Sequence, residues 1–301
     1  MTVNEYHEEF FGRRVVEYRK GGKLKDPQVV YRLTQDFEEE QSQRELLDEF
    51  LAKAGPQQLD ALILGPWAEA STGEPPSDYL EGLVAHALPK LRALFVGDMI
   101  VEDSEISWIK QADYTDLIKA YPHLEVLRIR GGNELVLPVT EYRALRELAI
   151  ETGGLPSSVV ESIKSSQLPA LRKLELWLGT DEYGFDGDLG TYRQLLEKID
   201  PARLEYLGLR NSEIADEIAV YIAKQPWLAS LHTLDLSMGT LGDEGAKALL
   251  ASRYIKGLKA LDVRHHYISD EVVEKLKALP LDLTIDAAED DDEDRYVQVG
   301  E

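Results

Sequence analysis

The chain has 301 residues and no cysteine, and its 56 Asp and Glu residues against 33 Lys and Arg residues give a formal net charge of −23. This composition excludes disulfides and thiolate metal sites, and so acidic a chain repels a polyanion such as nucleic acid. Residues 1–20 lack the apolar core of a secretory signal, and no stretch reaches the roughly 20 apolar residues of a membrane span, so we expect a cytoplasmic protein with neither a nucleic-acid nor a membrane partner.

The first 55 residues carry the signals of an N-terminal cap. Apolar residues on both sides of Gly21-Gly22 predict a β-hairpin over residues 13–33. A helix is predicted over residues 38–54, because its Leu and Phe residues recur on one face, and Gly55-Pro56 ends it. A repeat array needs such a cap, because its first strand and helix would otherwise expose apolar faces.

The chain then repeats one pattern, Leu-x-x-Leu-x-Leu, as far as residue 286. The copies that begin at Leu204, Leu231 and Leu258 follow one another at 27-residue intervals, and each precedes an acidic pair that opens an apolar helical stretch. Less regular copies begin at Leu59, Leu91, Leu124, Leu145 and Leu171, and a degenerate final copy spans residues 280–285. Residues 56–286 are therefore predicted to form a solenoid of about eight to nine strand–helix repeats.

This pattern resembles the ribonuclease-inhibitor-like branch of the leucine-rich-repeat proteins. Four further stretches resemble a bacterial cytoplasmic leucine-rich-repeat family of uncharacterised function, namely residues 107–114, 151–156, 176–184 and 295–301. The resemblance implies an α/β fold, a right-handed β-α superhelix shaped as a horseshoe, with a parallel sheet on the concave side and helices on the convex side. It implies no reaction.

The repeat also predicts which side chains line the concave sheet. Side chains alternate along a strand, so the fifth and seventh positions of each copy face away from the buried leucines and form ladders about 4.8 Å apart. These ladders place Arg130 beside Glu151, and Arg210 over Trp177 as a cation–π pair. The residues form either a partner-binding patch or a solvated face that neutralises its own charges. With Tyr183 from a nearby loop, the candidate partner-binding residues are Arg128, Arg130, Glu151, Glu175, Trp177, Arg210, Asp235, Asp262, Arg264 and Tyr183.

Aromatic residues gather in the long connections of the earlier repeats. Insertions in repeat proteins often lie on the face that binds. These side chains either cover an edge of the solenoid as a small satellite core or extend the recognition surface, and the sequence supports both interpretations equally. They are Trp67, Trp108, Tyr114, Tyr183 and Phe185, in the connections 66–78, 97–114 and 179–192.

Motifs that would carry chemistry are weak. The loop 181–188 holds four carboxylates among glycines, but Tyr183 and Phe185 stand where an EF-hand needs oxygen ligands. The pair His265-His266 has no further ligands at a recognisable spacing and is interpreted as surface histidine. No phosphate-loop, serine-hydrolase or zinc-protease motif occurs, so we predict no catalytic residue, no cofactor and no metal.

The two ends of the chain differ in charge. A run of six acids from Glu289 to Asp294 lies in a predicted acidic tail, residues 287–301, in which Tyr296–Val299 has strand character and either stays free or adds to a sheet edge. The basic residues of the predicted hairpin are interpreted as decoration of an edge strand, with docking of an acidic tail as the alternative. This cluster comprises Arg13, Arg14, Arg19, Lys20, Lys23 and Lys25.

The leading hypothesis is a non-catalytic scaffold that binds an unidentified partner protein on the concave face and the early-repeat loops, with a monomer as the simplest state. The alternative is a regulator of a partner enzyme, similar to the GTPase-activating proteins built on such repeats, which would use Arg128 or Arg130 on the partner's nucleotide. A small-ligand or metal-binding protein is the third hypothesis, for which no acid, base and nucleophile converge in the sequence.

Overall fold

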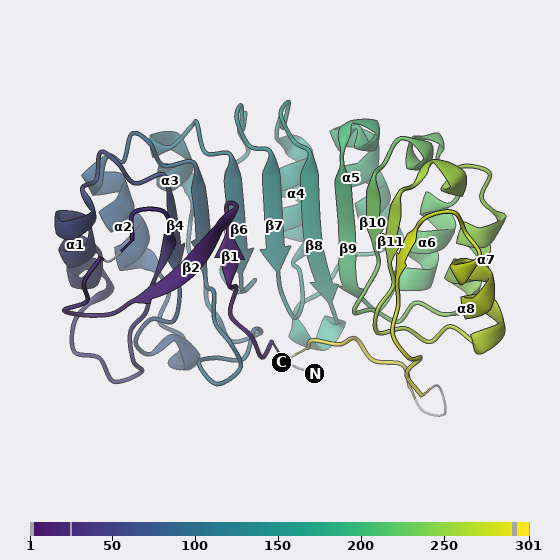
Figure 1. The fold of residues 1–301 in the computed structure, drawn as a ribbon, viewed down its shortest axis with the longest axis horizontal. Helices are drawn as coiled ribbons and strands as arrows, with labels where there is room; N and C mark the ends of the chain where they lie inside the picture. Colours follow the sequence, from purple (N-terminus) through teal and green to yellow (C-terminus); the bar gives the residue numbers. More distant parts are fainter. Residues whose placement is uncertain (1–2, 25, 291–293, 301) are drawn as a thin grey trace. The chain divides into compact units, whose positions relative to one another are not determined.

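The computed structural model describes residues 3–24, 26–290 and 294–300, and it divides the chain into two compact units. Unit 1 comprises Glu151–Ser165 and Leu171–Gly300, whereas unit 2 comprises the chain up to Ile150 together with Ser166–Ala170. In both units strands alternate with helices, and the helices lie on one face of the strands (Figure 1). Within the described residues, no helix is both long enough and apolar enough to cross a membrane.

Unit 2 contains the first seven strands, which follow one another in sequence order. β1 and β2 are antiparallel, and β2 to β6 are parallel to their neighbours. The strands are β1 (Glu9–Phe10), β2 (Arg13–Tyr18), β3 (Val30–Leu33), β4 (Ala61–Leu64), β5 (Ala93–Val96), β6 (Val126–Arg130) and β7 (Glu147–Glu151). The helices are α1 (Gln43–Ala54), α2 (Ser77–His86) and α3 (Thr115–Ala120), with the short 3-10 helix η1 (Ala70–Thr72).

Unit 1 contains the last five strands, also parallel and in sequence order. They are β8 (Lys173–Gly179), β9 (Tyr206–Ser212), β10 (Thr233–Asp235), β11 (Ala260–Asp262) and β12 (Asp282–Thr284). The helices are α4 (Ser157–Ser165), α5 (Leu189–Ile199), α6 (Ala215–Ile222), α7 (Asp243–Ala251) and α8 (Asp270–Lys277). Short 3-10 helices are η2 (Asp181–Tyr183), η3 (Pro201–Arg203), η4 (Pro226–Ala229) and η5 (Ile255–Gly257).

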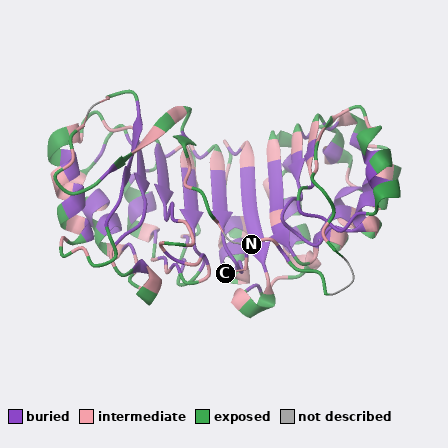
Figure 2. Ribbon diagram, turned by 60° about the horizontal axis from the view of Figure 1, so that its bottom comes forward, coloured by how far each residue is buried: buried purple, intermediate pink, exposed green. Residues whose placement is uncertain are grey.

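The strand prediction is confirmed in all nine copies of the repeat, which form β4 to β12. The second leucine of a copy is central to the core: Leu62, Leu174 and Leu234 are fully buried. A buried leucine contributes about 1.5–3 kcal/mol relative to an exposed one, so these repeats add similar increments to the core, whereas Leu283 of the last copy is only half-buried and adds less. The strands β4 to β9 are accordingly buried along most of their length (Figure 2), whereas β12 is largely exposed.

The predicted helix starts follow the acidic pairs of the late repeats. Asp243-Glu244 and Asp270-Glu271 stand in the first turns of α7 and α8, where the positive end of the helix dipole favours carboxylates. The first helix begins at Gln43, later than the predicted residue 38, because Ser42 and Glu45 form a capping box. The Ser42 hydroxyl accepts from the Glu45 amide at 3.2 Å, and the Glu45 carboxylate accepts from the Ser42 amide at 3.0 Å.

The predicted hairpin over residues 13–33 is wrong. β2 and β3 pair in parallel, with Val15 opposite Val30. The reversal lies earlier, at Phe11-Gly12 between β1 and β2, where both residues have positive φ angles of 51° and 69°. Because β3 is then followed by α1, this part of the predicted cap has the strand–helix order of a repeat.

The N-terminal segment of unit 2, by which we mean residues 3–10, covers the face of its sheet that bears no helix. Phe10 is buried there, and Val15 and Val126 pack partly buried around the same cluster. This apolar cluster lies on the face opposite Leu62 and its equivalents, because side chains alternate along a strand. Its buried members are Phe10, Val30, Ala61, Ile63, Ala93 and Phe95.

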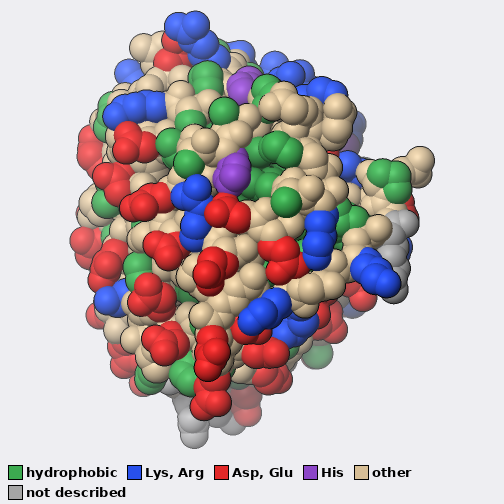
Figure 3. Space-filling view, turned by 90° about the vertical axis from the view of Figure 1, so that its left-hand side faces the viewer, with side chains coloured by type: hydrophobic (Ala, Val, Ile, Leu, Met, Phe, Trp, Pro, Cys, Tyr) green, Lys and Arg blue, Asp and Glu red, His purple; other side chains and the backbone are tan. Residues whose placement is uncertain are grey.

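The basic cluster near the N-terminus pairs with carboxylates of its own unit. Arg13 lies 2.7 Å from Asp60, and Lys20 lies 3.3 Å from Glu39. Figure 3, which looks onto the α1 end of unit 2, shows Lys and Arg interspersed with Asp and Glu rather than gathered in one basic patch. Lys25 lies outside the described residues.

The C-terminal segment 294–300 forms no strand, so it does not add to a sheet edge, which was one of the two alternatives that its sequence left open. It runs along the C-terminal ends of β9 to β11 (Figure 1). Val297 and Val299 are buried, so this part of the predicted acidic tail is docked. Residues 291–293 of the predicted acidic run lie outside the described residues.

Candidate functional site

The ladders of side chains predicted from the repeat exist on the helix-free face of unit 1, by which we mean the strand face that bears no helix. Trp177 of β8 stands opposite Arg210 of β9, and Asp235 of β10 stands opposite Asp262 of β11. The register is fixed by the buried leucines, because a slip of one residue would turn each of them out of the core.

Arg210 is the centre of an ionic network on this face. Its guanidinium lies 2.8 Å from a Glu175 oxygen and 3.3 Å from an Asp235 oxygen, and its Nε donates to the Ser237 hydroxyl at 3.0 Å. Although burial lowers the pKa of Arg210, the charges of Asp235 and Glu175 raise that pKa above its ordinary value. Arg210 is therefore a fixed cation between two carboxylates.

Two aromatic side chains hold this network in place. The Arg210 guanidinium lies over the Trp177 ring at 5.0 Å, which confirms the predicted cation–π pair, and the Trp177 indole donates to Glu175 at 2.9 Å. The Tyr206 hydroxyl donates to Asp235 at 2.7 Å, and burial together with the charge of Glu175 raises the pKa of Tyr206. Tyr206 therefore acts here as a neutral hydrogen-bond donor.

The predicted exposure of several site residues on this face is wrong. Trp177, Glu175 and Asp235 are 8%, 3% and 4% exposed, because the side chains interlock along the ladder and cover one another. Arg210 is partly accessible, and Arg264 is exposed and pairs with Asp262 at 2.6 Å. The accessible part of this face is therefore formed by the outermost charges of the ladder.

The predicted exposure of Arg128 and Arg130 in unit 2 is also wrong, because the N-terminal segment covers them. A His7 ring nitrogen lies 3.3 Å from each guanidinium, and Arg130 lies 3.7 Å from Asp98. Asp98 is fully buried and also accepts from Arg32 at 3.0 Å. Burial raises the pKa of Asp98, but its hydrogen bond with His7 and the charges of Arg130 and Arg32 lower that pKa by more. No sequence pattern predicts that His7 joins this cluster.

Two comparisons with known proteins bear on this architecture. A family model described as "Leucine Rich repeat" matches residues 228–250, which include β10 and most of α7. A crystal structure of a protein from Bacteroides fragilis is similar, with a TM-score of 0.76 and 34% sequence identity over 84% of this chain and 72% of that chain. The chain belongs to the leucine-rich-repeat proteins. The predicted α/β leucine-rich-repeat solenoid is thereby confirmed, and no curated protein matches the chain.

Two further predicted site residues of this leucine-rich-repeat protein lie at the end of β7 and in η2. Glu151 is fully buried, so its predicted exposure is wrong. Tyr183 is half-buried in η2, and its ring packs against Gly300, where an added Cβ would lie 2.7 Å from the ring. Tyr183 thus contacts the end of the C-terminal segment.

The interpretation of His265 and His266 as surface histidines is wrong, because both are buried. The two ring nitrogens of His265 lie 3.1 Å from a Glu289 oxygen and 3.0 Å from the Tyr296 carbonyl oxygen. His266 accepts from the Ile268 amide at 3.0 Å, and burial lowers its pKa. In this leucine-rich-repeat protein the pair holds the C-terminal residues and offers no open ligand position.

The aromatic residues of the long connections divide between the two interpretations. Trp67, Tyr114 and Phe185 are buried and act as satellite core, whereas Trp108 is 57% exposed. The acidic loop 181–188 uses its carboxylates locally: Asp188 caps α5. Across residues 3–24, 26–290 and 294–300, no group of three or more His, Asp or Glu side chains is placed to hold a metal ion.

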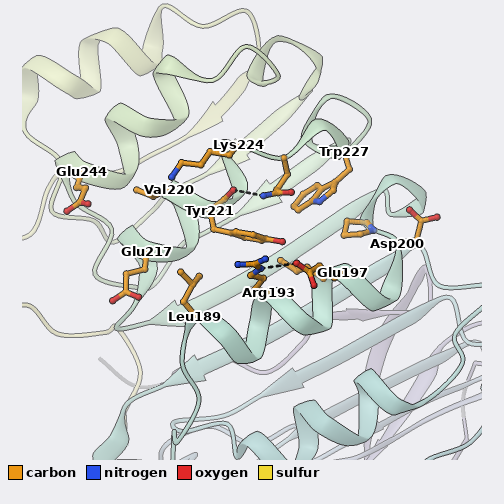
Figure 4. A pocket seen from close by; sticks show the side chains of 13 residues that line it. Leu189, Arg193, Glu197, Asp200, Glu217, Val220, Tyr221, Lys224, Trp227 and Glu244 are labelled. Atoms are coloured by element: carbon orange, nitrogen blue, oxygen red, sulfur yellow. Dashed lines mark hydrogen bonds and ion pairs between the residues drawn. The ribbon is translucent and has the colours of Figure 1, made fainter.

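The helix side of unit 1 carries a groove of about 790 Å³ between α5 and α6 (Figure 4). Tyr221 and Trp227 line it, and Figure 4 shows the Tyr221 ring beside the Arg193–Glu197 ion pair, whose atoms are 2.9 Å apart. Charges of both signs line the groove, so its electrostatics favour no particular class of partner for this leucine-rich-repeat protein.

Proposed function

We propose that the protein is a non-catalytic scaffold that binds another protein on the helix-free face of unit 1. Leucine-rich-repeat domains generally bind proteins, and this face carries a rigid set of charged and aromatic side chains. Ordered side chains lose little conformational entropy on binding, so such a set favours recognition. The exposed Trp108 of unit 2 is a further contact candidate among the early-repeat loops.

The observation that carries the proposal is a local reversal of charge on this face. The cationic side chains Lys173, Arg210 and Arg264 are 34%, 17% and 51% exposed. Counting side-chain atoms alone, the carboxylates of Glu175, Asp235 and Asp262 with which they pair are only 4%, 6% and 15% exposed. Although the whole chain carries a net charge of −23, the cations of β8, β9 and the residues after β11 are more exposed here than the carboxylates that they pair with.

This layering defines the kind of partner surface. Carboxylates on a partner would meet Lys173, Arg210 and Arg264 before they meet the acids beneath, and an Arg side chain can bind a carboxylate with two parallel hydrogen bonds. The surrounding net negative charge repels acidic proteins that approach elsewhere. We therefore expect a partner protein with an acidic contact surface.

The alternative, a regulator that inserts an arginine into a partner's nucleotide site, is not favoured. Such an arginine must reach out of its own protein to stabilise transferred charge. Arg128 and Arg130 are 9% and 1% exposed and lie beside His7 under the N-terminal segment.

The test is affinity capture with two matched variants of the full chain. Lys173→Gln with Arg264→Gln removes two exposed cations from the helix-free face of unit 1. Lys247→Gln with Lys275→Gln removes two exposed cations from α7 and α8, each from an i,i+4 ion pair. The melting temperature of each variant is measured first, so that loss of folding is recognised.

We expect the unchanged chain to capture an acidic protein. The Lys247→Gln, Lys275→Gln variant should capture the same amount of it, whereas the Lys173→Gln, Arg264→Gln variant should capture at least tenfold less. Equal retention by both variants would place the binding elsewhere and would reject this face as the site. If the affinity of the unchanged chain for the captured protein falls steeply as salt is added, the contact is ionic in character.

A further inference from the structure

The C-terminal segment contacts three successive repeats at equivalent positions. The Asn211 carboxamide bonds Val299, the Met238 carbonyl oxygen accepts from the Gln298 amide at 2.7 Å, and a His265 ring nitrogen lies 3.0 Å from the Tyr296 carbonyl oxygen. Residues 211, 238 and 265 are 27 residues apart, the period of the repeat. The contacts thus form a ladder along the strand ends.

The three contact residues share an uncommon backbone conformation. Asn211, Met238 and His265 have φ angles of 53°, 70° and 54°, a left-handed region that residues other than glycine seldom adopt. Non-glycine residues in this region cluster at ligand-binding positions, where the surrounding structure holds them. Three in register, each in contact with the same segment, form one continuous surface, which we call the strand-end groove.

The strand-end groove binds mainly the backbone of the segment. Asn211 bonds both the amide and the carbonyl of Val299, and the Tyr267 hydroxyl accepts from the Tyr296 amide at 3.0 Å and donates to its carbonyl oxygen at 3.1 Å. Main-chain recognition of this kind accepts many sequences, and side-chain pockets then select among them.

Side-chain selection comes from alternate positions of the segment. Val297 and Val299 are 6% and 2% exposed, whereas Tyr296 between Arg295 and Val297 is 51% exposed. The Arg295 guanidinium lies over the Tyr267 ring at 5.4 Å and 3.4 Å from an Asp216 oxygen. The groove therefore selects a cation followed, two and four residues later, by two small apolar side chains.

We propose that the strand-end groove is a peptide-binding site, which holds the chain's own C-terminal segment until an extended segment of a partner protein with the same chemistry replaces it. The partner segment has the pattern Arg-x-Val-x-Val or a close equivalent. The chain's own segment is tethered near the groove by Glu289, whose amide donates to the His266 carbonyl oxygen at 2.8 Å. Tethering gives an effective concentration in the millimolar range, so the segment acts as a built-in competitor.

This site differs from the surface in the proposed function, because it lies at the strand ends and binds mainly the backbone of an extended segment. Each proposal can fail without the other. The Lys173→Gln and Arg264→Gln substitutions do not alter any contact of the groove named above.

The experiment uses the full chain with Val297→Asp and Val299→Asp, which prevents its own segment from docking. The probe is a fluorescent peptide with the sequence of residues 294–301, and binding is followed by anisotropy. We expect the doubly substituted chain to bind the probe at least ten times more tightly than the unchanged chain. Adding Asn211→Ala to the double variant should abolish binding, and a probe with both valines replaced by aspartate should not bind. Lys247→Gln in the double variant is the matched control and should leave probe binding unchanged.

The proposal would be overturned if the folded double variant did not bind the probe. It would also be overturned if adding Asn211→Ala to the double variant left its affinity for the probe unchanged. If the double variant does not fold, amide hydrogen exchange of the unchanged chain decides. If the Gln298 and Val299 amides exchange much faster than the amides of the strand cores, the segment leaves the groove in the native state, as proposed. If these two amides exchange only at the rate of global unfolding, the proposal is overturned. A dimer of the unchanged chain that the valine substitutions dissociate would also overturn the proposal, because a second copy rather than the tethered segment would then occupy the groove.

Discussion

Asn211 and Val299 are 88 residues apart in sequence, yet the carboxamide of one satisfies both backbone polar atoms of the other. The Val299 amide donates to Asn211 Oδ1 at 2.9 Å, and Asn211 Nδ2 donates to the Val299 carbonyl oxygen. Both residues are buried, so neither bond is replaced by water when it is lost. The position of the C-terminal segment therefore depends strongly on one side chain.

Replacement of Asn211 should release the C-terminal segment. Asn211→Ala removes the two buried hydrogen bonds to Val299 and a longer one, 3.5 Å, to the Thr152 carbonyl oxygen, and it places alanine in a left-handed conformation. We expect the free energy of unfolding to fall by about 2–4 kcal/mol. Asn211→Gly removes the same bonds but tolerates the conformation, so its loss should be about 1 kcal/mol smaller. Urea unfolding and amide exchange at Val299 measure both effects, and unchanged exchange at Val299 in both variants would contradict the expectation.

Most of the repeat architecture could be predicted from the sequence, because the information is local. A leucine at every second strand position reports burial on one face, and an acidic pair reports a helix start within the same repeat. All nine predicted strands are present for this reason. The neighbours in a ladder, such as Trp177 and Arg210, follow from the same period.

The exposure of the ladders could not be predicted in the same way, because it depends on segments that are remote in sequence. Arg130 is covered by residues near the N-terminus, and His265 contacts Tyr296 near the C-terminus. One signal was present in the sequence: the outward positions Ile63 and Phe95 of the early repeats are apolar, whereas Asp235 at the corresponding position of a late repeat is charged. A large apolar ladder on a strand face indicates that something covers it.

The ion network on the helix-free face of unit 1 should depend on its central cation, Arg210. Arg210→Ala leaves Glu175 and Asp235 buried without that cation, and we expect a loss of about 3–5 kcal/mol in the free energy of unfolding. Arg264→Ala, in the same ladder, breaks an exposed pair with Asp262 and should cost less than about 1 kcal/mol. Urea unfolding gives the loss of unfolding free energy for each variant. Equal losses would show that burial of the carboxylates does not determine how much the network contributes to stability.

Glu49 of α1 should contribute to stability in a defined pH range. Its hydrogen bond from Lys53 at 2.7 Å, helped by that from Tyr18 at 2.8 Å, holds the pKa of Glu49 at about 2, although burial opposes this shift. Because the folded-state pKa lies below the ordinary value of 4.5, this stabilisation is present above about pH 4.5 and is lost as the pH falls towards 2.

Glu49→Gln should therefore lower the free energy of unfolding at pH 7 and flatten its decline between pH 4.5 and 2. Glu81→Gln, at an exposed position of α2, serves as the control and should leave the pH profile unchanged. Urea unfolding measured at intervals across this range gives both profiles. A Glu49→Gln profile that stays parallel to that of the unchanged chain would contradict the assignment.

The register of the whole array can be tested at Leu234, which is fully buried in β10 between β9 and β11. Leu234→Asp places a charge in the core, which costs several kcal/mol of stability. Repeats stabilise one another only through their neighbours. Protection from amide exchange should therefore be lost in β9 to β11 and reduced less in the more distant repeats of unit 1. Lys259→Asp, at an exposed position just before β11, introduces the same side chain at the surface and should change the melting temperature little. Thermal melts followed by circular dichroism, together with amide exchange, distinguish the two variants. A Leu234→Asp chain that melts like the unchanged one would mean that the leucine does not face the core, and the assignment of inward and outward positions along every strand of the repeat would then be wrong.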